Sequence, residues 1–163
     1  MKATELLKRQ HREVASLFKG VLASEDPDER MRLANEIATK LMVHTTIEEE
    51  IFYPAFREAA ETQKGEEQVL EAYEEHHVVK LLVAEIPDAD ASAESFEAKM
   101  TVLKELVEHH VDEEEDEMFP AAERKLGKDR LEELADELEA RAGQIERDAG
   151  EASERSSRSS AGA

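Results

Sequence analysis

The chain has 163 residues, enough for one domain with a buried core and a tail. It contains no cysteine, which excludes disulfides, iron–sulfur clusters and thiol catalysis, so any metal must be held by nitrogen and oxygen donors. The 41 acidic residues against 21 basic ones give a net charge of -20, which predicts no direct binding to nucleic acid. The polar start of the chain lacks a signal peptide and no run approaches the ~18 apolar residues of a membrane span, so we expect a cytoplasmic protein without membrane contact.

Five segments carry apolar residues at helical spacing, and none shows the alternation typical of a strand. The segments are marked in chain order by Val14, Phe18 and Val21, by Leu33, Ile37 and Leu41, by Val69, Val79 and Val83, by Phe96, Met100 and Leu103, and by Leu131, Leu134 and Leu138.

Four short connections separate these segments, at residues 23–27, 61–65, 86–90 and 125–128. In the first connection, Asp26 is a predicted helix cap and Pro27 fits the first helical turn. Short connections favour an all-α, antiparallel up-down-up-down four-helix bundle over residues 1–125. Residues 126–147 are predicted to form an additional C-terminal amphipathic helix, packed outside the bundle or forming a partner surface. The polar residues 148–163 are predicted to be a disordered tail.

An internal repeat lies over the second and fourth segments. The stretch from His44 to Pro54 matches the stretch from His110 to Pro120, with a glutamate four residues after each histidine and a proline ten residues after it. The first and third segments also correspond, because His11 and His76 are each followed by apolar residues at offsets of three, six, seven and ten. Each half therefore predicts one helix with an inward histidine and a second helix with an inward histidine and glutamate.

The repeated glutamates Glu48 and Glu114 fall on faces that should be hydrophobic. Residues four apart share a helix face, so each glutamate can point to the same site as His44 or His110. A lone histidine on an apolar face is more often a hydrogen-bonded core residue, and a single His-x-x-x-Glu is usually an exposed pair. Two buried, facing carboxylates, however, are costly unless they are protonated or bound to cations. The duplicated spacing therefore favours a metal pair bridged by the glutamates.

The ordered motifs resemble the hemerythrin/HHE cation-binding family over roughly residues 1–125. The resemblance implies a hemerythrin-like bundle with two iron ions joined by an oxo or hydroxo bridge and by Glu48 and Glu114. It implies that one iron is bound by His11 and His44 and the other by His76 and His110. Open positions on the ions would take O2, H2O2 or NO. Manganese and zinc remain alternative metals.

The sequence departs from the oxygen-carrying members of that family on the third segment. Those members place two histidines four residues apart there, whereas Ala72 precedes His76 by four residues in this chain. Either one iron is more open, or Tyr73 or His77 supplies the missing donor. The simpler interpretation places Tyr73 in core packing and His77 in an outer position. Acidic neighbours of the motif such as Glu49 and Glu115 are interpreted mainly as a solvated face, with some of them as hydrogen-bond partners of the metal ligands or as groups that guide cations inward.

Three functions are consistent with these patterns. The first is a di-iron protein that reacts with small oxidants, with catalase-like breakdown of peroxide as one reaction. The second is a binding module that buffers iron, or senses iron or oxygen for a protein partner, without catalysis. The third is a helical interaction protein that has lost its metal, against which the intact ligand spacing argues.

Overall fold

The computed structural model describes residues 1–162, and within them the elements are helical and no strand occurs. The bounds of the elements are α1 Ala3–Ala23, α2 Pro27–Ile47, the π-helical turn η1 Glu48–Phe52, α3 Tyr53–Ala60, α4 Gln63–Glu85, the short 3₁₀ helix η2 Ile86–Asp88, α5 Glu94–Glu113, the π-helical turn η3 Glu114–Met118, and α6 Phe119–Ala161.

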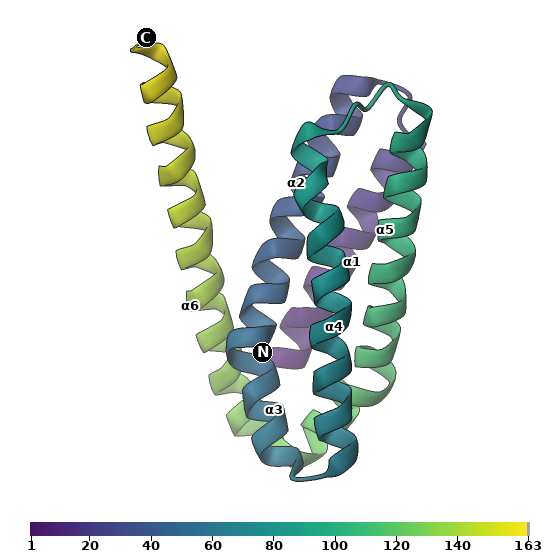
Figure 1. Ribbon diagram of the computed structural model, residues 1–163. Helices are drawn as coiled ribbons and strands as arrows, with labels where there is room; N and C mark the ends of the chain where they lie inside the picture. Colours follow the sequence, from purple (N-terminus) through teal and green to yellow (C-terminus); the bar gives the residue numbers. More distant parts are fainter. Residues whose placement is uncertain (163) are drawn as a thin grey trace.

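Four long rods form the bundle. Helix α2 continues without a break through η1 into α3, and α5 continues in the same way through η3 into the first residues of α6. With α1 and α4, these composite helices run alternately up and down (Figure 1). The predicted all-α, antiparallel four-helix bundle is confirmed.

The connections between the rods are built by the expected residues. The Asp26 side chain accepts a hydrogen bond from the Asp28 N–H and so caps α2. The Thr62 side chain caps α4 by accepting from the Gly65 N–H. Gly65 lies so close to the preceding helix that an added Cβ would come within 2.7 Å of the Ala60 Cβ, so the turn requires glycine there.

The core consists of two apolar clusters with a polar layer between them. One cluster contains Phe18, Ile37 and Met100 and fills the end of the bundle where α1 meets α2. The other contains Phe52 and Phe119 and fills the opposite end, together with the start of α6. The buried histidines and glutamates fall between these clusters along each rod, so apolar packing on both sides shields them from water.

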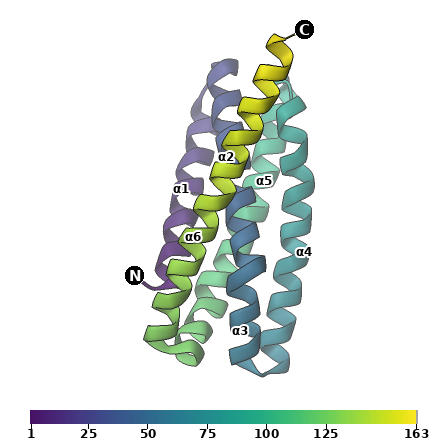
Figure 2. The same cartoon turned by 90° about the vertical axis from the view of Figure 1, so that its left-hand side faces the viewer.

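Helix α6 changes direction at Gly127. This residue has φ 74° and ψ 170°, a conformation that favours glycine, and it lies within the predicted fourth connection. Beyond it the helix packs along α1, α2 and α3, as two views show (Figures 1 and 2), and buries Leu131, Leu134 and Leu138. The predicted additional helix is therefore present and lies outside the bundle.

The tail differs from its prediction. Residues 148–161 continue α6 instead of forming a disordered segment, and their side chains are exposed. Extending a formed helix costs far less than nucleating one, and this stretch contains the helix formers Ala, Glu and Arg, with an ion pair of 3.4 Å between Glu151 and Arg155. Low hydrophobicity predicted the absence of packing correctly but not the absence of a helix.

No helix within residues 1–162 combines the length and apolar character needed to cross a membrane.

The packing of α6 generates a stability prediction. Leu134 is fully buried against the bundle, so Leu134→Ala should lower the free energy of unfolding by about 2–5 kcal/mol. Urea denaturation of the metal-free protein, followed by circular dichroism, measures this change. A chain ending at Arg147 is the matched control and should keep the wild-type midpoint, because the removed residues pack against nothing. An unchanged midpoint for Leu134→Ala would contradict the docking of α6.

Candidate metal centre

All six residues predicted to bind metal point into the middle of the bundle. None is more than 6% exposed, and Glu48 and Glu114 are 0% and 1% exposed. One residue comes from α1, one from α2, one from α4 and one from α5, and the glutamates are the first residues of the two π-helical turns. The six are His11, His44, Glu48, His76, His110 and Glu114.

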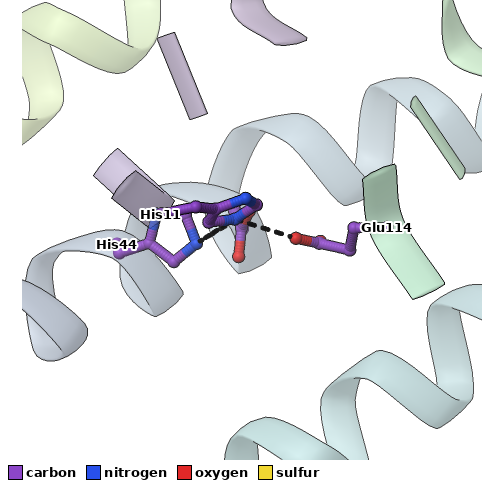
Figure 3. Close-up of side chains that lie close together, drawn as sticks. His11, His44 and Glu114 are labelled. Atoms are coloured by element: carbon purple, nitrogen blue, oxygen red, sulfur yellow. Dashed lines mark hydrogen bonds and ion pairs between the residues drawn. The ribbon is translucent and has the colours of Figure 1, made fainter. Parts of the chain in front are cut away.

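The side chains form two adjoining groups. In the first, the Nε2 atoms of His11 and His44 lie 3.2 Å apart, and His11 Nε2 lies 3.3 Å from Glu114 Oε2 (Figure 3). In the second, the Nε2 atoms of His76 and His110 lie 3.0 Å apart. Glu48 joins the groups, with one oxygen 3.1 Å from His44 Nε2 and the other 3.3 Å from His76 Nε2.

These spacings suit metal ligands. Two donors that bind one ion at right angles with bonds of about 2.1 Å lie about 3.0 Å apart. The ligand atoms of His11, His44, Glu48 and Glu114 all lie within 4.8 Å of one another, and so do those of Glu48, His76 and His110. The residues therefore fit a cation in each group.

Two buried oxygens support the same interpretation. Glu48 Oε1 and Glu114 Oε2 are buried and have no partner in full hydrogen-bond geometry, and their nearest polar neighbours are the Nε2 atoms of His44 at 3.1 Å and His11 at 3.3 Å. An unpartnered carboxylate oxygen in a protein interior is costly, and a bound cation removes that cost.

Each of the four buried histidines is held from outside the cluster through its Nδ1 atom. On one side, His11 Nδ1 lies 2.8 Å from Glu115 and His44 Nδ1 lies 2.7 Å from the Gln10 side-chain oxygen. These acceptors require a proton on Nδ1, so that Nε2 points inward and can bind a cation once any proton on it has left.

The second half repeats this arrangement. His76 Nδ1 lies 2.9 Å from Glu49, and His110 Nδ1 lies 3.0 Å from Glu75. Glu49 also accepts from Lys80 at 2.7 Å. Glu49 and Glu115 do not belong to the predicted solvated face, because each reaches across to a histidine on a neighbouring helix, which is the alternative role that the sequence allowed.

Tyr53 is the residue that the sequence patterns missed. It is fully buried, and its hydroxyl donates to Glu114 Oε1 at 2.7 Å and lies 3.3 Å from Glu48 Oε2. The hydroxyl is also 3.2 Å from His76 Nε2 and 3.3 Å from His110 Nε2. Tyr53 thus lies in the second group, where an oxygen donor can join the imidazoles.

The π-helical turn explains this placement. With about 3.6 residues per turn, a residue five places after Glu48 would point roughly 140° away from it. The Tyr53 N–H instead bonds to the Glu48 carbonyl, which widens the turn and returns Tyr53 to the Glu48 face. Pro54 has no N–H for a regular helical bond, so a widened turn just before it is favourable. Pro120 follows the matching π-helical turn at Glu114 in the same way. A proline inside a helical pattern is therefore the sequence feature that could have indicated the widened turn and the inward position of Tyr53.

The other candidates lie outside the cluster. The Tyr73 hydroxyl donates to the Glu49 backbone carbonyl at 3.2 Å, and its ring packs against Tyr53. His77 is exposed on α4. Neither side chain joins the two groups described above.

A family comparison agrees with this geometry. The model of the hemerythrin HHE cation-binding domain matches residues 2–122. The chain belongs to this family. Residues 2–122 include all six buried candidates and Tyr53, so the family match and the cluster cover the same part of the chain.

Relatives of this hemerythrin-family chain are diverse. It is 31% identical over 147 residues to an uncharacterized protein of Mycobacterium tuberculosis, covering 89% of this chain and 88% of that protein. It is 26% identical to an uncharacterized hemerythrin-like protein of Schizosaccharomyces pombe, covering 80% of this chain and 64% of that one. A DNA nickase of Nostoc is 29% identical over 90% of this chain, which corresponds to 40% of the nickase. No solved structure matches the chain.

The charges of this hemerythrin-type cluster depend on one another. Burial lowers the pKa of His11, but the hydrogen bond and charge of Glu114 outweigh it and raise the pKa to about 8. Burial also lowers the pKa of His76, but hydrogen bonds to the carboxylates of Glu48 and Glu49 outweigh it and raise the pKa to about 9. Burial raises the pKa of Glu48, but the charge and hydrogen bond of His44 hold it well below its usual range. Without metal, protons on imidazoles therefore balance the buried carboxylates.

These shifts predict opposite pH effects on the metal-free and metal-bound protein. The pKa values of His11 and His76, about 8 and about 9, exceed their unfolded value of 6.5. Their contribution to stability is complete below pH 6.5 and is lost as the pH rises through these values. The Tm of chelator-stripped protein should therefore fall between pH 6.5 and pH 9, whereas the gain in Tm on metal binding should grow, because bound metal replaces the protons. Differential scanning calorimetry tests both trends.

The matched control is His77→Ala, which removes an exposed imidazole next to a buried one and should leave both trends unchanged. A metal-free Tm that rises over the same interval would contradict the proposed charge balance.

Proposed function

We propose that this chain binds two iron ions at the cluster and uses them to react with O2, H2O2 or NO, with catalase-like breakdown of peroxide as its reaction. The observation that carries the proposal is the pair of histidine groups joined by two fully buried glutamates. Each group offers two inward Nε2 atoms, and the carboxylates between them can be shared. Mixed imidazole and carboxylate donors suit iron, with manganese and zinc as alternatives.

The donors of the two ions differ. Tyr53 lies beside His76 and His110, whereas its counterpart in the repeat is Phe119, whose ring stacks on His11 at a centroid distance of 5.8 Å. The second ion thus has a protein oxygen donor that the first lacks. Burial and the charges of Glu114 and Glu48 raise the pKa of Tyr53 well above its usual value, so it ionises only if a cation binds beside it. A small ligand would therefore bind beside His11 and His44, where the protein offers no phenol oxygen.

An apolar cavity borders the histidines. It has a volume of about 20 Å³, room for a molecule the size of water or dioxygen. Its walls include all four ligand histidines together with Val14, Leu41, Val79, Val107 and Val111. Such walls admit small uncharged molecules and disfavour anions, a selection that matches O2, NO and H2O2.

The protein's own part in peroxide breakdown is positioning and protection. The bound ions would accept two electrons from one H2O2, which becomes O2 and releases two protons, and would pass two electrons to another H2O2, which takes up two protons and becomes two water molecules. The Nδ1 acceptors hold each imidazole in place, and apolar packing on both sides of the layer excludes bulk water. The Tyr53 hydroxyl donates a hydrogen bond to Glu114 Oε1. The proton in this hydrogen bond would have to leave if Tyr53 bound a cation as a phenolate.

A sensing or iron-buffering role is the second candidate. Residues 148–161 of α6 extend from the bundle with every side chain exposed, which leaves them free for a partner (Figure 1). Rapid O2 evolution from peroxide favours the enzyme, and reversible O2 binding without turnover favours the sensor. The net charge of -20 still predicts no binding to nucleic acid.

Removing a shared carboxylate tests the metal centre. Purified wild-type protein should contain two irons per chain, and Glu48→Ala should release them, because both histidine groups lose a ligand at once. Metal analysis by mass spectrometry and the visible absorption before and after peroxide measure the effect. Glu50→Ala is the matched control, since Glu50 lies two residues away and pairs with Arg141 outside the site. Two irons retained in Glu48→Ala would rule out the assignment.

Tyr53→Phe tests the phenolate. If Tyr53 binds ferric iron, the variant should keep both ions but lose the phenolate-to-iron absorption band of the wild type. Tyr73→Phe should leave the spectrum unchanged, because the Tyr73 hydroxyl bonds to a backbone carbonyl. A wild-type spectrum for Tyr53→Phe would leave Tyr53 only its hydrogen bond to Glu114.

A further inference from the structure

The two halves of the bundle can be compared position by position. The repeat pairs α1 with α4 and α2 with α5, so that His11 corresponds to His76 and His44 to His110. The inward histidines and glutamates are the same in the two halves. The residues that flank them on the outer side are not.

In the first half, the flanking positions are apolar and covered. Leu6 and Ile47 are fully buried in one cluster with Leu131, Leu134 and Leu138 of α6, and Val43 is buried beside them on α2. Figure 2 shows α6 lying across α1 and α2. This side of the metal layer is sealed by the additional helix.

In the second half, the same positions carry polar and acidic residues. Glu71 replaces Leu6, His109 replaces Val43 and Glu113 replaces Ile47. Between α4 and α5 lies a cavity of about 70 Å³ whose walls include these acids and the ligands His110 and Glu114. The polar residues lining it are Gln68, Glu71, Glu75, His110, Glu113, Glu114 and Glu117.

The inner wall of this cavity includes a candidate ligand of the metal centre. Glu114 lines the cavity and is 1% exposed, and one of its oxygens, Oε2, has no partner in full hydrogen-bond geometry. A cation moving inward through the cavity therefore meets a buried carboxylate that can bind it.

The outer end holds a second group of donors. His109 Nε2 lies 3.2 Å from Glu113 Oε1 and 3.5 Å from Glu75 Oε2, and the three ligand atoms lie within 4.8 Å of one another. The other oxygen of Glu75 contacts His110 Nδ1 at 3.0 Å. Glu75 thus contacts both the outer group and a ligand of the centre.

We propose that this acid-lined cavity is the route by which divalent transition-metal ions enter the centre, and that Glu75, His109 and Glu113 form an outer site where the ion first binds. The proposal rests on the proposed metal centre. Negative side chains attract a hydrated cation and raise its rate of association, and an imidazole among them favours a transition metal over magnesium or calcium. At the rim of the cavity, Lys64 forms an ion pair with Glu117 at 3.0 Å. Lys64 is largely exposed and does not pair with Glu71, Glu75 or Glu113.

Uncharged ligands have a separate approach. The apolar cavity described above borders the four histidines and has no acidic residue in its walls. Cations and small oxidants would therefore reach the metal layer by different paths, each with walls that suit its charge.

The test measures the rate of metal uptake in the full-length, metal-free protein. Stopped-flow mixing with Co2+ follows the visible absorption of the bound ion, and mass spectrometry gives the final metal content. The double variant His109→Ala/Glu113→Gln should load roughly tenfold more slowly, at low salt, and reach the same final content. Glu74→Gln/His77→Ala is the matched control, because it makes the same chemical changes on the exposed face of α4 and should load at the wild-type rate.

A second measurement addresses the outer site directly. Protein with a filled centre is titrated with Mn2+, and electron paramagnetic resonance counts the free ion. Wild type and the control pair should bind one additional Mn2+ weakly, and His109→Ala/Glu113→Gln should not. Equal loading rates for wild type and this variant, or an additional Mn2+ retained by the variant, would overturn the entry route. A wild-type protein that takes up no Co2+ would instead refute the metal centre itself.

Discussion

The burial of Glu48 and Glu114 between facing helices is the constraint on which the rest of the site depends. Removing a carboxylate from water costs several kcal/mol even after the surroundings relax. In the metal-free molecule, protonated imidazoles and the Tyr53 hydroxyl offset this cost, as the raised pKa values of His11 and His76 show. In the proposed metal-bound state, the ions would take over the same task with greater charge. The histidines would then exchange their protons for metal.

The helical rods and the six inward residues were predictable because they depend on regular helix geometry. His44 and Glu48 are four residues apart within one helical turn, and His110 repeats that relation with Glu114. The position of Tyr53 was not predictable by the same rule, because the π-helical turn changes the angle between consecutive residues just after Glu48. Regular helix geometry instead favours Tyr73, which keeps the helical phase of His76 but reaches only a backbone carbonyl.

The outer hydrogen bonds were also difficult to predict. Glu49 and Glu115 follow the inward glutamates directly, so on a single helix each points toward the neighbouring rod rather than into the core. Their partners, His76 and His11, lie far away in the sequence and become neighbours only when the bundle closes. Each acidic run after a buried glutamate therefore contains two kinds of carboxylate. Some are solvated, and others, such as Glu49 and Glu115, hold a buried histidine in position.

The repeat provides two equal halves, and the chain makes them unequal in three linked ways. Phe119 lies beside His11, whereas Tyr53 lies beside His76 and His110; Gln10 takes the place of Glu75; and α6 packs against α1, α2 and α3. These differences act in one direction. The tyrosine hydroxyl, the additional carboxylate of Glu75 and the acid-lined cavity all lie beside His76 and His110, so negative charge accumulates on that side of the metal layer. The covered half keeps a neutral phenyl ring and a neutral amide beside its histidines, which suits an ion with a position open to uncharged ligands.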